Sequence, residues 1–179
     1  MFEIINSSVI SGVRIVRLLH FEDERGKFRE IFRKEWFPER SWDVLQSNLS
    51  MSRAGVLRGL HYHFNQVDYW YVTSGRLRAG LVDLRPSSPT FRATKTVDMG
   101  EGNDVGLFIP VGVAHGFATH TTAKLIYFVD NYYDGNDEYG VRWDDPALGI
   151  DWGIVEPVVS ARDKSNPLFN AILPEDMPG

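Results

Sequence analysis

The apolar residues of this chain fall into short runs that are separated by Gly, Pro, Asn and Asp, and long helical periodicity is scarce. Such runs predict strands, here at 13–19, 27–32, 56–64, 68–75, 76–85, 90–99, 104–110, 116–122 and 123–133. Only 33–42 and a segment after Asp163 have a weak helical pattern. We therefore expect one all-β domain over residues 1–179, a jelly roll of two sheets with short flanking helices.

Composition narrows the function classes. A net charge of −5 argues against a surface for nucleic acid or anionic membranes, because both need a positive field. The absence of cysteine excludes disulfides, thiolate metal sites and a Cys nucleophile, and it is compatible with the cytoplasm. The N-terminal stretch MFEIINSSVISG lacks the pattern of a signal peptide, and no apolar run is long enough to span a membrane. We expect a soluble cytoplasmic protein.

Histidines and one carboxylate recur in the stretch GVLRGLHYHFNQVDYWYVTSG and in IPVGVAHGF further on. Alternate residues of a strand share a face, so His61 and His63 point the same way and Tyr62 points opposite. With Asp68 and His115 they offer three imidazoles and one carboxylate, which borderline divalent metals prefer. The same residue types also serve proton transfer, so the residues alone leave both kinds of site open.

The spacing from Gly55 through HYH and Asp68 to Gly75 resembles the first cupin motif, with Asp where Glu is usual, and IPVGVAH resembles the second. A closer resemblance runs over most of the chain, through EDERGKFREIF, VLQSNLSMSRAGVLRGLHYH, VDLRPSSPTF, YFVDNYY, VRWDDPALGIDW and SARDKSNPL. Together these stretches resemble the dTDP-4-dehydrorhamnose 3,5-epimerase family of dimeric cupins. The resemblance implies a cupin jelly roll that inverts C3, C5 or both in a nucleotide-linked 4-keto-6-deoxy sugar.

Inversion next to a ketone requires a base, an acid on the opposite face and a group that stabilises the enolate. By resemblance the base is His61 of RGLH, and its carboxylate partner is Asp163 of SARDKSNPL. A carboxylate on one ring nitrogen fixes the tautomer and stabilises the imidazolium. By resemblance again, the acid is Tyr127, the first Tyr of YFVDNYY.

The resemblance also implies contacts to the substrate. A chain of net negative charge must neutralise a diphosphate locally, for which the planar fork of Arg is suited. We expect a homodimer in which some contacts cross between subunits. The matching positions are Arg25, Phe28, Glu30, Gln46, Asn48, Arg58, His115 and Tyr133.

Two positions depart from the family pattern: His63 stands where Gln is usual, and Asp68 stands where a Lys is expected near the sugar ketone. Either another cationic group replaces that Lys, or a divalent metal ion held by His61, His63, Asp68 and His115 polarises the ketone. We favour proton transfer without a cofactor, because a metal would occupy His61. The alternatives are a metal-dependent cupin oxygenase or isomerase and a non-catalytic sugar-binding cupin.

Overall fold

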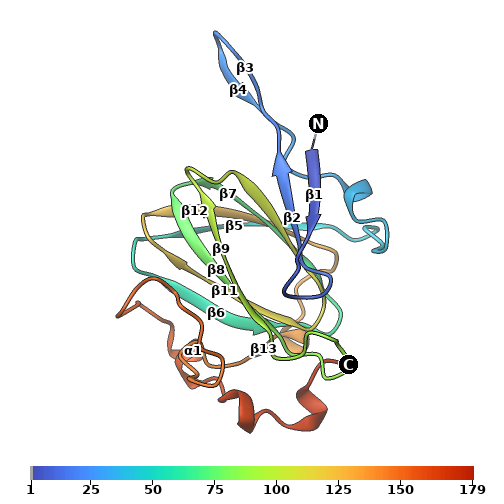
Figure 1. Ribbon diagram of the computed structural model, residues 1–179, viewed down its shortest axis with the longest axis vertical. Coiled ribbons are helices and arrows are strands. Elements are labelled where there is room, and N and C mark those ends of the chain that lie inside the picture. The colour runs from blue at the N-terminus through green and yellow to red at the C-terminus, as the bar shows by residue number, and fades with distance from the viewer. Residues whose placement is uncertain (1) are drawn as a thin grey trace.

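The computed structural model describes residues 2–179, which form two antiparallel sheets that face each other (Figure 1). The six-stranded sheet has the order β1 (Phe2–Asn6), β2 (Arg14–Leu18), β10 (Val105–Ile109), β7 (Asp68–Ser74), β12 (Ala123–Val129), β5 (Gln46–Ser52). The five-stranded sheet has the order β13 (Tyr139–Gly140), β6 (Leu57–Tyr62), β11 (Val113–Thr119), β8 (Arg76–Asp83), β9 (Thr94–Gly100). The predicted all-β jelly roll is confirmed.

The main core lies between the two sheets. Trp70 and Val72 of β7 point inward and pack with Leu77 and Leu81 of β8 and with Phe117 of β11. Their neighbours on β7 point to the other face because side chains alternate along a strand. As a result, apolar side chains fill most of the space between the two sheets.

The outer faces are covered by the segments that follow or precede the strands. Trp36, the last residue of the 3-10 turn η1 (Lys34–Trp36), and Phe37 after it pack on Tyr69 of the six-stranded sheet. The C-terminal segment crosses the five-stranded sheet (Figure 1), where Trp152 and Phe169 bury Leu60 and its neighbours. That segment includes α1 (Ala161–Ser165) and the 3-10 turns η3 (Phe169–Ala171) and η4 (Pro174–Asp176), so it carries Asp163 to the sheet edge.

Some predicted boundaries are wrong. The predicted strand 27–32 ends at residue 28, because the chain leaves the ladder where Arg29 pairs with Asp104 and Tyr71. The predicted strand 116–122 starts earlier, at Val113, and ends at Thr119 before a turn. The weak helix at 33–42 is only the turn η1, which ends just before Pro38.

One small sheet stands apart from the two main ones. β3 (Phe21–Asp23) and β4 (Gly26–Phe28) form a hairpin that projects beyond the rest of the molecule (Figure 1). Its three-residue strands are exposed throughout. Among residues 2–179, no helix has the length and apolar character needed to cross a membrane.

Candidate active site

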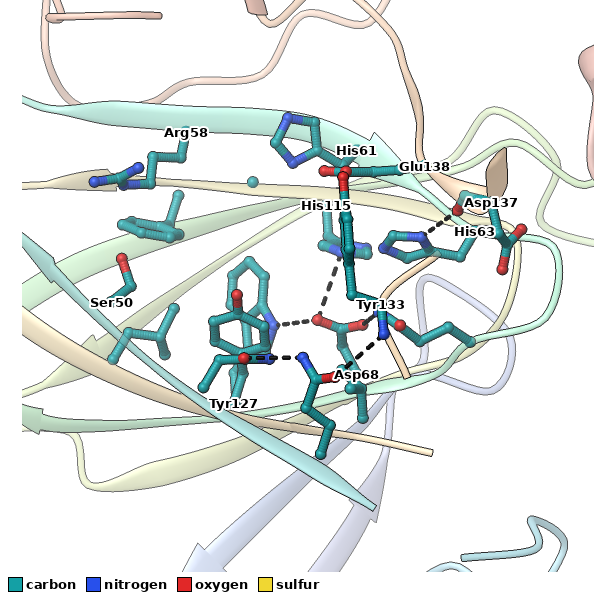
Figure 2. Close-up of a pocket in the computed structure, with 18 of the residues that line it drawn as sticks. Ser50, Arg58, His61, His63, Asp68, His115, Tyr127, Tyr133, Asp137 and Glu138 are labelled. Atoms are coloured by element: carbon teal, nitrogen blue, oxygen red, sulfur yellow. Dashed lines mark hydrogen bonds and ion pairs between the residues drawn. The ribbon is translucent and has the colours of Figure 1, made fainter. Parts of the chain in front are cut away.

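A cavity of about 350 Å³ opens between the two sheets (Figure 2). One wall comes from β5, β7 and β12 of the six-stranded sheet, and the other from β6 and β11 of the five-stranded sheet. The structure brings His61, His63, Asp68 and His115 together in this cavity, as predicted. The full lining is Gln46, Asn48, Ser50, Arg58, His61, His63, Gln66, Asp68, Trp70, His115, Gly116, Phe117, Leu125, Tyr127, Val129, Tyr132, Tyr133, Asp134, Asp137 and Glu138.

His61 lies on β6 and contacts Asp163 of α1, with 2.8 Å between Nε2 and Oδ1. Two further hydrogen bonds hold the buried Asp163, one at its carboxylate and one at its backbone. The backbone N–H of Gly59 donates to Oδ2 at 3.1 Å, and the hydroxyl of Ser160 accepts from the backbone N–H of Asp163 at 3.0 Å. Gly59 has φ +124°, and a Cβ there would lie 2.6 Å from the Cα of Gly116, so this position of β6 requires glycine.

This contact fixes the proton on one nitrogen of the ring. A carboxylate only accepts, so Nε2 of His61 carries the hydrogen and Nδ1 is left with a lone pair. Burial raises the pKa of Asp163, but the hydrogen bond and charge of His61, together with the hydrogen bonds of Gly59 and Ser160, lower it overall. Asp163 therefore stays ionised and stabilises the imidazolium that forms when Nδ1 takes a proton.

Tyr127 lies on β12, in the opposite wall from His61. Its side chain is half-buried, and burial, followed by the negative charge of Asp68, raises the pKa of its phenol. The phenol is thus protonated at neutral pH and can donate a proton toward the cavity. A ligand between the two sheets would have His61 on one side and Tyr127 on the other.

The other two histidines of the cavity are oriented by backbone carbonyls. Nδ1 of His63 lies 2.6 Å from the carbonyl of Asp137, and Nδ1 of His115 lies 2.9 Å from that of Val113 (Figure 2 shows the first contact). Nε2 of His115 faces Oδ2 of Asp68 at 3.8 Å. Burial lowers the pKa of His115, so this ring is neutral.

The four-residue metal set that we considered in the sequence is not formed as such. His63, Asp68 and His115 each offer a ligand atom, and these atoms lie within 4.8 Å of one another. His61 does not belong to this group. Its Nε2 contacts Asp163 instead.

Several predicted substrate contacts line the same cavity. Arg58 is exposed at its rim and donates through Nε to the hydroxyl of Ser52 at 3.1 Å. Gln46 and Asn48 lie side by side on β5, with 3.0 Å between Nε2 of Gln46 and Oδ1 of Asn48. The carboxamide oxygen of Gln46 also accepts from the backbone N–H of Tyr133 at 3.1 Å. These polar groups form one side of the cavity mouth.

The remaining three predicted contacts lie outside the cavity of this chain. Arg25 and Phe28 lie on the projecting hairpin, where the Arg25 side chain is 84% exposed and pairs with Asp23 at 2.6 Å. Glu30 follows the hairpin and pairs with Arg33. Within one chain these residues do not reach His61.

The sequence did not point to several residues that shape the site. Trp70 and Gln66 both donate to the carboxylate of Asp68, at 2.9 and 3.0 Å. Glu138 lines the cavity and pairs with Arg162 at 2.7 Å. Burial raises the pKa of Glu138, but the hydrogen bond and charge of Arg162, with smaller contributions from His61 and Tyr133, lower it overall. The polar run DGNDE after YFVDNYY is the one sequence signal that could have indicated this rim.

Comparison with known proteins decides the class. Residues 7–171 match the family model described as dTDP-4-dehydrorhamnose 3,5-epimerase. The chain belongs to this family. The predicted recognition and the predicted class of sugar epimerase are thereby confirmed, and the metal-dependent oxygenase or isomerase that we kept as an alternative is not supported.

Individual relatives of the epimerase family agree. The chain is 37% identical to a dTDP-4-dehydrorhamnose 3,5-epimerase of Sinorhizobium fredii over 166 residues, which is 88% of this chain and 85% of that protein. It is 35% identical to the Salmonella typhimurium epimerase over 178 residues, covering 95% and 97% of the two chains.

A solved structure extends the likeness to the fold. The Legionella pneumophila epimerase RmlC, in complex with dTDP-4-keto-L-rhamnose, superposes with a TM-score of 0.92 at 34% identity. The match covers 99% of this chain and 98% of that one. Sequence and structure comparisons therefore point to the same epimerase family, and the solved structure has the same fold as this chain.

Proposed function

We propose that this chain is an epimerase of a dTDP-4-keto-6-deoxyhexose that inverts C3, C5 or both. The observation that carries the proposal is the placement of His61, with its lone pair on Nδ1, and the protonated Tyr127 in opposite walls of one cavity. Epimerisation needs a base on one face of a carbon and an acid on the other. The complex of the Legionella enzyme with dTDP-4-keto-L-rhamnose supports this class of substrate.

In the proposed reaction, Nδ1 of His61 removes the proton next to the ketone and becomes an imidazolium that Asp163 stabilises. Electrons move into the ketone oxygen, which becomes an enolate. Tyr127 then delivers a proton to the opposite face, and its phenolate is reprotonated from water. Both proton transfers use protein side chains, so the transfers themselves need no cofactor.

The remaining contacts follow from where side chains lie at the cavity mouth. Arg58 is the exposed cation on the lining and is suited to a phosphate oxygen. Gln46, Asn48, His115 and Tyr133 supply polar and aromatic surface for the sugar and the nucleotide.

We also propose a homodimer, in which the projecting hairpin brings Arg25 and Phe28 to the cavity of the second subunit and Glu30 follows. Phe28 is 66% exposed on the hairpin. β5 is an edge strand whose Leu49 and Met51 are also exposed. Exposed apolar edges of this kind require a partner. Light scattering should report twice the chain mass, and a stable monomer would contradict the dimer.

A cytoplasmic location fits the absence of cysteine.

The test is incubation with a dTDP-4-keto-6-deoxyhexose in D₂O, followed by NMR at C3 and C5. Deuterium at both carbons with inverted configuration would identify a 3,5-epimerase, and deuterium at one carbon would identify a mono-epimerase. Binding of the nucleotide sugar without any deuterium uptake would show a non-catalytic sugar-binding protein and would reject the proposal.

A further inference from the structure

Two histidines of the cavity are held through the same ring nitrogen. His63 and His115 each place Nδ1 against a backbone carbonyl, at 2.6 and 2.9 Å. A carbonyl oxygen can only accept, so in both rings Nδ1 carries the hydrogen. In the neutral rings, Nε2 is therefore a lone-pair donor in each case.

The carboxylate of Asp68 is held just as firmly. It is buried at the start of β7, where Nε1 of Trp70 donates to Oδ2 at 2.9 Å and Nε2 of Gln66 donates to Oδ1 at 3.0 Å. Oδ2 lies 3.8 Å from Nε2 of His115 (Figure 2). The three ligand atoms from His63, Asp68 and His115 all lie within 4.8 Å of one another.

We propose that His63, Asp68 and His115 form a binding site for one divalent first-row transition metal ion such as Zn²⁺. Three electron-pair donors that face each other in a buried space repel unless a positive charge lies between them. Ligands about 2.0–2.1 Å from a tetrahedral ion stand roughly 3.4 Å apart, so small side-chain rotations close the observed spacing.

The surroundings of the three side chains match those of metal ligands. A histidine ligand typically donates its second ring N–H to a carbonyl or carboxylate, and a carboxylate ligand is itself hydrogen-bonded. Both features are present for His63, His115 and Asp68. Two imidazoles with one carboxylate favour Zn²⁺ and its neighbours over Mg²⁺ and Ca²⁺, which prefer oxygen ligands.

This site differs from the four-residue set considered in the sequence, because His61 remains free to act as the base. A metal bound at Nδ1 of His61 would take up the lone pair that the proposed base needs, and a site without His61 removes that conflict. The ion would put positive charge in the cavity where the enolate forms. This role rests on the proposed function, whereas binding of the ion does not.

The experiment measures zinc directly. Protein stripped with a chelator and dialysed is titrated with ZnCl₂ and, separately, with MgCl₂, with bound metal counted by elemental analysis and the melting temperature followed in parallel. We expect one Zn²⁺ per chain, a raised melting temperature and no comparable effect of Mg²⁺. Asp68→Asn and His63→Gln should each weaken zinc binding at least about 100-fold.

Two further variants separate the possible outcomes. His61→Asn should still bind one zinc ion, and His20→Gln, which alters an exposed histidine outside the cavity, should behave like the wild type. Loss of zinc in His61→Asn would overturn the three-residue site, as would wild-type protein that binds no stoichiometric zinc. If Asp68→Asn does not fold, His63→Gln and the wild-type titration still decide the matter. Because zinc is counted without turnover, failure of this site and failure of the epimerase proposal are distinguishable.

Discussion

The cavity holds two pairs of His and Asp that are alike in composition and different in geometry. His61 and Asp163 are 2.8 Å apart, with a hydrogen on the nitrogen that faces the carboxylate. His115 and Asp68 are 3.8 Å apart, and the hydrogen of His115 is on the other nitrogen, which donates to the carbonyl of Val113. The first pair is a base with a carboxylate partner, whereas in the second two electron-pair donors face each other.

The difference shows that the residue types in a pair do not decide its chemistry. The deciding feature is which ring nitrogen donates its hydrogen to a backbone carbonyl or a carboxylate. The other nitrogen then keeps its lone pair. In this molecule the carbonyl of Val113 accepts the hydrogen of Nδ1 of His115. This single contact makes His115 a potential metal ligand and not a member of a proton-transfer pair like His61 and Asp163.

His61→Asn is expected to have the largest effect, because it removes the base of the first pair. Asn cannot take up a proton, so deuterium uptake at C3 and C5 should fall by about 10²–10⁴-fold. Binding of dTDP should remain close to that of the wild type, since Arg58 is untouched. Exchange measured by NMR at the wild-type rate would show that the second pair, rather than the first, carries the chemistry.

Tyr127→Phe asks whether Tyr127 or the second pair returns the proton. Burial raises the pKa of Tyr127, which keeps its phenol protonated and suited to donation. Without the hydroxyl, deuterium should still enter the substrate, while the rate of inversion should drop about 10²-fold. The ratio of exchange to inversion, measured on one sample by NMR, checks this. Unchanged inversion would assign the acid to another group of the cavity.

Asp163→Asn should have a smaller effect on the rate. The amide oxygen can still accept the hydrogen of Nε2, but it lacks the charge that stabilises the imidazolium. A hydrogen bond to a charged group is worth about 1.5–3 kcal/mol, which corresponds to a loss of roughly 10- to 100-fold in kcat. Steady-state kinetics with Asp144→Asn, a change in a surface pair with Arg142, provide the control. Equal kcat values for the two variants would remove Asp163 from the mechanism.

Much of the fold could be predicted because apolar alternation is a local property. β7 and β8 were predicted to within two residues from DYWYVTSG and RLRAGLVDLR. β5 was missed, since its sequence QSNLSMS is rich in Ser and has no β-branched or aromatic residue. β5 forms through pairing with β12, which is a tertiary effect that local sequence does not encode.

The candidate site likewise has features that local sequence predicts and features that depend on tertiary contacts. The shared face of His61 and His63 follows from the two-residue period of a strand. The contact of His61 with Asp163 spans 102 positions, and only the family resemblance indicated it. The orientation of His63 could not be predicted, because it depends on the carbonyl of Asp137, a group that every residue has.

The smallest predicted effect concerns stability in acid and tests the first pair without substrate. Burial raises the folded-state pKa of Asp163, but the interactions with His61 and the hydrogen bonds of Gly59 and Ser160 together lower it overall. The stabilisation is therefore fully present above the unfolded pKa of about 3.9 and is lost as the pH falls through the lower folded-state pKa. The wild type should lose its advantage in free energy of unfolding over Asp163→Asn between pH 5 and the acid limit of the native state. Denaturant unfolding at a series of pH values measures the difference. Asp83, buried with Arg85, titrates in both proteins and cancels, so a difference that stays constant with pH would mean that Asp163 is not ionised against His61.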